Sequence, residues 1–275
     1  MIKLIALDMD GTLLDSRSQI SQFNMDTIKK AQLKGLRVAI CTGRFPENIK
    51  IMLDDIGLQC DIIALNGATV DTNGKRIHQA FLPIDIGKEV FEMLEKHDAK
   101  YVMFQDHRII TRKEDTIYHA EKLYGERLKA EYGVSFERGY EAAKKAVSGG
   151  VSKFFVFDSP ENTAVLNEMY GYVKTVENVD VTRSGPHNFE VMPKNTGKGV
   201  GIQKLAEFYN IPMSETMAVG DHENDITMIR AAGLGVAMGN AIDLIKKEAD
   251  VITDTNDQDG VAKAILHYAM GEEAL

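Results

Sequence analysis

The sequence predicts an α/β protein built on a doubly wound, Rossmann-like parallel sheet, with a second α/β domain inserted into it. At both ends of the chain, short apolar or β-branched runs alternate with longer helical patterns. Such strand–helix–strand repetition implies parallel strands covered by helices. The middle of the chain differs, with paired strands and a long polar helix. We therefore expect a core domain of residues 1–82 and 187–275 and an inserted α/β domain of residues 83–186.

The expected elements of the core domain alternate along the chain, the strands as short apolar runs and the helices as amphipathic stretches. Gly35 marks the end of the first helix. Before the insertion the elements are a strand at 2–7, a helix at 23–35, a strand at 36–43, a helix at 46–57 and a strand at 61–68. After it they are helices at 198–210, 223–232, 240–248 and 259–270, separated by strands at 216–220, 233–238 and 250–253.

The inserted domain is expected to mix helices with paired strands. Its elements are a helix at 85–97, a hairpin within 100–112, a long polar helix at 115–130, a strand at 151–158, a helix at 160–170 and a strand pair at 172–183. The Asp-His-Arg sequence in the middle of 100–112 suggests the turn of the hairpin.

Composition and charge argue against several classes of function. Of the 275 residues, 44% are hydrophobic and 27% are charged, which is typical of a globular chain of one or two domains. The formal net charge of −9 argues against a surface for nucleic acid or an anionic membrane. The only cysteines are Cys41 and Cys60, which excludes a disulfide framework. With no export signal or membrane span in the sequence, we expect a cytoplasmic protein, and no protein partner is indicated.

Two aspartates follow the first expected strand, in the stretch LDMDGTLLD at residues 7–15. Asp8 and Asp10 are two residues apart, so on extended chain their side chains point to the same side. Two carboxylates this close hinder each other's ionisation unless a cation neutralises them. Mg²⁺ fits, because it binds through one or two carboxylates together with water and substrate phosphate. The alternative is a solvated Asp-Gly turn, for which Gly11 is equally suited.

Three further stretches carry groups suited to phosphate. CTGR at 41–44 offers the Thr42 hydroxyl and the Gly43 backbone N–H, although an ordinary strand-to-helix turn has the same pattern. PKNTGKGVG at 193–201 places Lys198 at a helix start, where an acidic residue is more usual, and its glycine spacing excludes a Walker-type loop. NGA at 66–68 is a weaker signal, because Asn-Gly is a common turn.

A second acidic cluster, VGDHEND at 219–225, also follows an expected strand. Asp221, Asn224 and Asp225 can face one point from the loop and the first helical turn. Helix N-capping explains one such residue but not three. Separate strand ends and helix starts therefore supply an acid pair, a hydroxyl with backbone donors, a lysine and metal-binding carboxylates, which is what a phosphoryl-transfer site needs.

These motifs resemble those of the haloacid dehalogenase (HAD) superfamily, and specifically its Cof-type phosphatases with a class IIB cap. DMDGTLL, CTGR, GKG and GDHEND occur in the order of that family, and the similarity spans the whole chain. The resemblance implies a HAD core with an inserted cap domain. It also implies a Mg²⁺-dependent phosphoric monoester hydrolase acting on small phosphorylated metabolites, with sugar phosphates the leading class and flavin or nucleotide-like phosphates as further options.

The resemblance also implies a role for each motif residue. Asp8 would be the nucleophile that forms an aspartyl-phosphate, and Asp10 would be the general acid and then the general base. Mg²⁺ would be held by Asp8, the backbone carbonyl of Asp10 and Asp221, with Asp225 in support. The transferring phosphoryl group would be held by the Met9 backbone N–H, Thr42, Gly43, Lys198 and Asn224.

Four residues outside these roles are candidates for contacting the rest of the substrate. Arg183 and His187 lie just before the expected return to the core, Arg44 could reach the same space from the core, and Asn66 belongs to the NGA turn. A solvated side chain is the alternative for the three charged or titratable candidates. Two other functions also stay open: a phosphomutase that shares the nucleophile, and a noncatalytic phosphometabolite-binding protein. The intact Asp8–Asp10 pair argues against the second.

Overall fold

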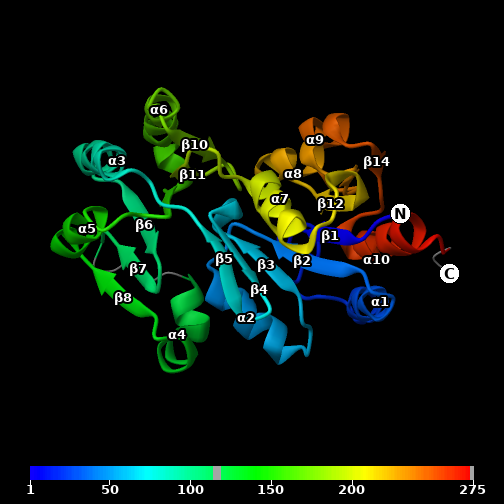
Figure 1. Cartoon of the computed structure of the whole chain (residues 1–275). Coiled ribbons are helices and arrows are strands. Elements are labelled where there is room, and N and C mark those ends of the chain that lie inside the picture. Colours follow the sequence, from blue (N-terminus) through cyan, green and yellow to red (C-terminus); the bar gives the residue numbers. More distant parts are fainter. Residues whose placement is uncertain (114–118, 273–275) are drawn as a thin grey trace. The chain divides into compact units, whose positions relative to one another are not determined.

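The computed structural model describes residues 1–113 and 119–272, and the chain forms two compact units (Figure 1). The first unit comprises Met1–Pro46, Met52–His78 and Gly197–Leu275, and the second comprises Glu47–Ile51 and Gln79–Thr196. The second unit therefore begins and ends at other residues than the expected 83 and 186. It returns to the first unit ten residues later because residues 188–193 form a strand of its own sheet.

An eight-stranded sheet is the centre of the first unit. Parallel pairing joins β14 to β13, β13 to β12, β12 to β1, β1 to β2 and β2 to β3, whereas β4 pairs antiparallel with β3. The carboxyl ends of the parallel strands consequently meet at one edge. In sheet order the strands are β14 (Val251–Ile252), β13 (Leu234–Ala237), β12 (Thr216–Gly220), β1 (Leu4–Leu7), β2 (Arg37–Cys41), β3 (Asp61–Ala64), β4 (Thr69–Thr72) and β5 (Lys75–Gln79).

Helices pack on this sheet, which confirms the expected α/β, Rossmann-like class. All four residues of β1 are buried, as expected for a strand covered on both faces. The helices of the first unit are α1 (Gln22–Leu33), α7 (Lys198–Tyr209), α8 (Ile226–Ala231), α9 (Asp243–Glu248) and α10 (Gly260–Ala264), which continues as a π-helical turn at Ile265–Ala269. The helix α2 (Pro46–Asp55) is divided between the units, because Glu47–Ile51 belongs to the second. The helix α1 begins where the Ser21 hydroxyl accepts a hydrogen bond from the Asn24 N–H, and α1 packs against α10.

The strands β4 and β5 were not predicted. They are joined by Asn73 and Gly74, both with positive φ (48° and 72°). Asn-Gly between apolar or β-branched runs is a strong hairpin signal, so the sequence did contain the information. The expected strand at 61–68 is shorter than predicted, because the chain turns at Leu65 and Asn66 with left-handed backbone conformations.

The second unit is a six-stranded sheet with helices packed on one face. Its hydrophobic core joins that face to the three helices α3 (Ile84–Lys96), α5 (Tyr140–Val147) and α6 (Thr163–Val173). A further helix, α4, is described at His119–Tyr132, and the first part of the helix expected at 115–130 lies outside the described residues. In sheet order the strands are β10 (Val179–Thr182), β11 (Asn188–Pro193), β9 (Lys153–Phe157), β6 (Lys100–Gln105), β7 (Arg108–Thr111) and β8 (Ser135–Arg138).

The strand pair expected at 172–183 is wrong. The helix α6 continues to Val173, whose side chain is fully buried in the core of the unit, and only β10 follows it. Its antiparallel partner is β11, which lies after the expected end of the domain. The hairpin expected within 100–112 is confirmed as β6 and β7, whereas β8 and α5 were not predicted.

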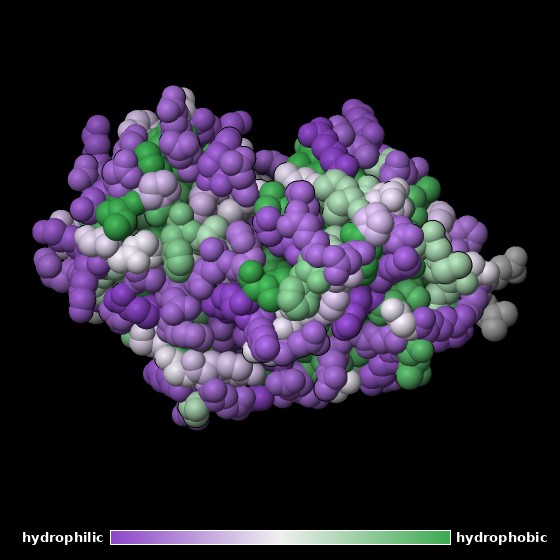
Figure 2. All heavy atoms as spheres, in the orientation of Figure 1, coloured by the Kyte–Doolittle hydropathy of each residue, from purple (hydrophilic) through white to green (hydrophobic). Residues whose placement is uncertain are grey.

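Among the described residues, no helix combines the length and the apolar character that a membrane crossing requires. The face shown in Figure 2 is mostly hydrophilic, with hydrophobic residues in small separate areas.

Candidate active site

Asp8 directly follows β1 and is held in a tight turn. The turn is closed by hydrogen bonds from the Leu13 N–H to the Asp8 carbonyl (3.2 Å) and from the Leu14 N–H to the Met9 carbonyl (2.9 Å). Gly11 lies in this turn with φ of +81°, a conformation that strongly favours glycine. The turn leaves the Asp8 side chain buried at the carboxyl edge of the sheet.

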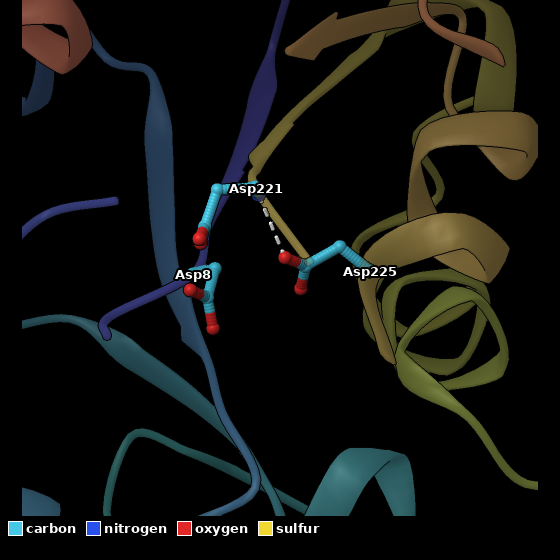
Figure 3. Close-up of side chains that lie close together, drawn as sticks. All are labelled: Asp8, Asp221 and Asp225. Carbon is cyan, nitrogen blue, oxygen red and sulfur yellow. Dashed lines mark hydrogen bonds between the residues drawn. The ribbon is translucent and has the colours of Figure 1, made fainter. Parts of the chain in front are cut away.

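Asp221 and Asp225 come from the neighbouring strand end. Val219 of β12 is in register with Leu7 of β1, so Asp221 and Asp8 follow adjacent strands. One Asp225 carboxylate oxygen accepts hydrogen bonds from the backbone N–H groups of Asp221 (2.8 Å) and His222 (3.0 Å). These bonds bring the Asp225 side chain back toward the strand end, as Figure 3 shows.

Two glycines make room for the carboxylates. A Cβ on Gly11 would lie 2.5 Å from Oδ2 of Asp221, and a Cβ on Gly220 would lie 2.6 Å from the Asp225 Cβ. Both distances are well below van der Waals contact, so neither position accepts a side chain without moving an aspartate. Lack of space for a side chain therefore explains why each acidic motif contains a glycine, Gly11 in the first and Gly220 in the second.

The three aspartates form an acidic group that suits a divalent cation. One carboxylate oxygen each from Asp8, Asp221 and Asp225 lie within 4.8 Å of one another (Figure 3). Burial, followed by the charge of Asp225, raises the pKa of Asp8 well above its usual value. The same two causes raise the pKa of Asp221 to about 6. Oxygen ligands whose ionisation is disfavoured without a counter-charge are the ligands that Mg²⁺ would bind and stabilise.

Lys198 supplies one positive charge to this group. It is the first residue of α7, its side chain is fully buried, and Nζ donates hydrogen bonds to Asp8 and Asp225. Burial alone would lower the pKa of Lys198, but the charges of Asp225 and Asp8 outweigh it and raise the pKa. Three ionised carboxylates and one ammonium leave a charge of −3 + 1 = −2, which one divalent cation would neutralise.

Thr42, Asn66 and Asn224 form a chain of contacts at the same edge of the sheet. The Asn66 N–H donates to the Thr42 carbonyl (3.0 Å), and the Asn66 side-chain oxygen accepts from Asn224 Nδ2 at 3.4 Å. Asn66 adopts a left-handed conformation (φ 54°, ψ 40°), which asparagine tolerates better than most residues. Gly43 follows Thr42 in the turn between β2 and α2. The NGA turn therefore has a structural role beside the two predicted phosphate-binding side chains.

A family model of haloacid dehalogenase-like hydrolases matches residues 5–265. The chain belongs to this family. It is 33% identical to the 5-amino-6-(5-phospho-D-ribitylamino)uracil phosphatase YcsE of Bacillus subtilis (98% of this chain, 96% of the relative). It is 31% identical to the phosphatase YwpJ of the same organism (97% and 99%). Among solved structures, the HAD subclass IIB sugar phosphatase BT4131 matches with a TM-score of 0.82 at 27% identity, covering 98% of this chain and 99% of that one. The predicted resemblance is confirmed, and the protein is an enzyme of the HAD hydrolase family.

The remaining predicted residues of this HAD enzyme fall into two groups. Asp10 lies outside the group of three carboxylates and pairs with Arg44, within the first unit. The predicted metal contact of Asp10 through its backbone carbonyl stays a prediction. Arg183 and His187 belong to the second unit. There the Arg183 guanidinium lies 4.1 Å from the Tyr170 ring and donates to Asn167, and His187 Nδ1 lies 3.4 Å from the Thr163 hydroxyl.

Two residues beside the acidic group, Thr12 and Asn240, were not predicted from the sequence. The buried Thr12 hydroxyl donates to Oδ1 of Asp221 at 2.9 Å, and Asn240 Nδ2 donates to the Gly11 carbonyl at 2.7 Å. Both fix the geometry of the acidic loops. Thr12 is part of the DMDGTLL motif, and Asn240 follows β13, the strand next to β12. A polar residue in the loop after a strand is the signal that could have identified both.

The pKa of Asp221 predicts how stability without metal depends on pH. Because its folded pKa of about 6 exceeds the usual value of 3.8, its contribution to stability is fully present below about pH 4 and is lost as the pH rises through 6. In EDTA, Asp221→Asn should therefore raise the melting temperature relative to wild type more at pH 7.5 than at pH 5. With Mg²⁺ at pH 7.5, Asp221→Asn should instead have a lower melting temperature than wild type, because the metal binds the ionised carboxylate. Thermal unfolding at both pH values checks this, and equal differences at the two would contradict it.

Proposed function

We propose that this protein is a Mg²⁺-dependent phosphatase that hydrolyses small phosphorylated metabolites through an aspartyl-phosphate. The observation that carries the proposal is the buried Asp8 carboxylate at the end of β1, bonded to Lys198 and within 4.8 Å of Asp221 and Asp225. A nucleophile, a fixed cation and two further metal ligands meet there. This combination is what transfer of a phosphoryl group to a carboxylate needs.

The chain's own residues would carry both steps. An Asp8 oxygen attacks phosphorus, the bond from phosphorus to the leaving oxygen breaks, and Asp10 gives that oxygen a proton. Asp10 then takes a proton from water, whose oxygen attacks phosphorus and releases inorganic phosphate and free Asp8. Lys198 offsets negative charge at Asp8 during both steps. The backbone N–H of Met9 with Thr42, Gly43 and Asn224 would hold the phosphoryl oxygens.

Mg²⁺ fits the donor set of Asp8, Asp221 and Asp225, and when bound it would neutralise charge on the phosphoryl oxygens. A bound Mg²⁺ would also favour the ionised form of Asp8. Because burial and Asp225 raise the pKa of Asp8, a divalent charge nearby would return Asp8 to the ionised form that attacks phosphorus.

Sugar phosphates are the substrate class that we favour. The name of the solved relative BT4131 describes a sugar phosphatase, and the name of YcsE describes a phosphatase of a phosphorylated ribitylamino-uracil. Both names describe a phosphate ester of a small polyhydroxylated compound, although YcsE's substrate also carries a pyrimidine ring. The cytoplasmic location stays a prediction.

The test is inorganic phosphate release from a panel of hexose phosphates, polyol phosphates, a ribitylamino-uracil phosphate and flavin mononucleotide, with Mg²⁺ or with EDTA. We expect release only with Mg²⁺, and highest for one of the sugar or polyol phosphates. Conversion of a sugar phosphate into an isomer without phosphate release would instead indicate a phosphomutase. Tight binding without any product would indicate a phosphometabolite-binding protein.

A further inference from the structure

Asp10 and Arg44 form a two-point ion pair in the first unit. Arg44 Nε donates to one carboxylate oxygen of Asp10 at 2.9 Å, and Nη2 donates to the other at 2.5 Å. A guanidinium that engages both oxygens fixes the plane of a carboxylate as well as its position. We propose that Arg44 is the positioning residue of Asp10 and sets the direction in which Asp10 exchanges a proton with the leaving oxygen. This inference rests on the proposed phosphatase function.

Asp10 needs such a partner more than Asp8 does. The Asp8 side chain is buried and held by Lys198, whereas the Asp10 side chain is 60% exposed. An exposed carboxylate on a turn can adopt several side-chain conformations, and a general acid acts only from those that reach the leaving oxygen. A guanidinium that holds Asp10 in one orientation would therefore increase the rate at which Asp10 protonates the leaving oxygen.

Arg44 is well placed to hold Asp10, because its own position is fixed within the first unit. Its backbone N–H donates to the Thr42 hydroxyl (3.2 Å), and its carbonyl accepts from the Leu65 N–H (3.1 Å). Its Nη1 lies 3.2 Å from Sδ of Met52 in α2. The contacts thus run from the turn that carries Thr42, through Arg44, to Asp10. Through Arg44, the proposed general acid Asp10 is connected to the turn that would bind the phosphoryl group.

This role differs from the one predicted from the sequence, in which Arg44 contacts the substrate itself. Substrates with different leaving groups distinguish the two roles. An alkyl phosphate releases an alkoxide that must be protonated as it leaves, whereas p-nitrophenyl phosphate releases a stable anion that needs little help from an acid. A residue that acts through Asp10 affects the first substrate much more than the second. A residue that binds the phosphoryl group affects both alike.

The experiment compares kcat and KM of wild type, Arg44→Gln, Asp10→Asn and the double variant, with Mg²⁺, on the best sugar phosphate of the panel and on p-nitrophenyl phosphate. We expect Arg44→Gln to lower kcat on the sugar phosphate about 10²-fold and on p-nitrophenyl phosphate less than about threefold. In the Asp10→Asn background, Arg44→Gln should cost nothing further, because its effect runs through Asp10. Arg44→Lys, which keeps the charge but not the fork, should recover part of the loss.

Arg17→Gln is the matched control, because Arg17 pairs with Asp15 through Nε and Nη2 on the loop that follows the same strand. It should leave both substrates unchanged. Equal losses on the two substrates, an effect confined to KM, or additive losses in the double variant would overturn the positioning role while leaving the phosphatase intact. A wild type that hydrolyses neither substrate would overturn the proposed function, and the positioning role with it.

Discussion

Asp8→Asn should abolish phosphate release, by at least about 10⁴-fold in kcat, without destabilising the metal-free protein. The loss follows from removing the proposed nucleophile. The stability follows from the environment of Asp8, because burial and the charge of Asp225 raise its pKa and so disfavour the ionised form. A neutral amide of nearly the same shape relieves that cost, and Lys198 keeps its bond to Asp225.

The measurement is a pair of assays on one preparation: phosphate release with Mg²⁺ and thermal unfolding in EDTA. We expect a melting temperature equal to or above that of wild type, together with a smaller rise on adding Mg²⁺, since one of the metal's ligands is weakened. Activity of the variant within tenfold of wild type would show that Asp8 is not the nucleophile. A lower melting temperature would show that Asp8 is favourably paired rather than strained.

Lys198→Met should impair stability as well as activity, unlike Asp8→Asn. Lys198 is fully buried between Asp8 and Asp225. Removing one partner of a buried ionic group leaves uncompensated charge and costs about 3–5 kcal/mol. Because Asp8 and Asp221 have raised pKa values and their protonation relieves that cost, the destabilisation in EDTA should be larger at pH 8 than at pH 5.

Chemical denaturation of Lys198→Met at the two pH values checks this, with the double variant Lys198→Met/Asp225→Asn as control. Neutralising Asp225 should restore much of the stability and none of the activity, because the lysine that offsets charge at Asp8 is still missing. If the single variant is as stable as wild type at pH 8, the buried ionic group does not contribute as described. Recovery of activity in the double variant would argue against a role for Lys198 in the reaction.

Much of the site was predictable because the chemistry lies at strand ends. A carboxylate directly after an apolar strand is visible in one sequence, and parallel strands bring their carboxyl ends together. Asp8 and Asp221 were found in this way, and register pairing confirms that their strands are adjacent. The partners of these residues were less accessible. Lys198 is separated from Asp8 by 190 residues, and only the fold shows that the lysine bonds the aspartate directly.

The errors arose where pairing in space decides the structure. The strand β11 has the apolar character of a core strand, and only its antiparallel pairing with β9 and β10 assigns it to the second unit. The pairing of Arg44 with Asp10 depends on how far one side chain reaches across two neighbouring turns, which spacing along the chain does not encode. The hairpin of β4 and β5 was a different error, since its Asn-Gly turn was present in the sequence.

The order of strands in the first sheet has a consequence for how the enzyme is made. The strand β1 precedes every strand of the second sheet in the chain, yet it lies between β2 and β12, and β12 follows every strand of the second sheet. Until the segment from Lys198 to Asp225 is synthesised, β1 has an unpaired edge and Asp8 has neither its lysine nor its acidic neighbours. All the strands of the second sheet, by contrast, are complete once Pro193 has been added. Translation therefore completes the second sheet before the first, and Asp8 acquires its charged surroundings only after the second sheet has been synthesised.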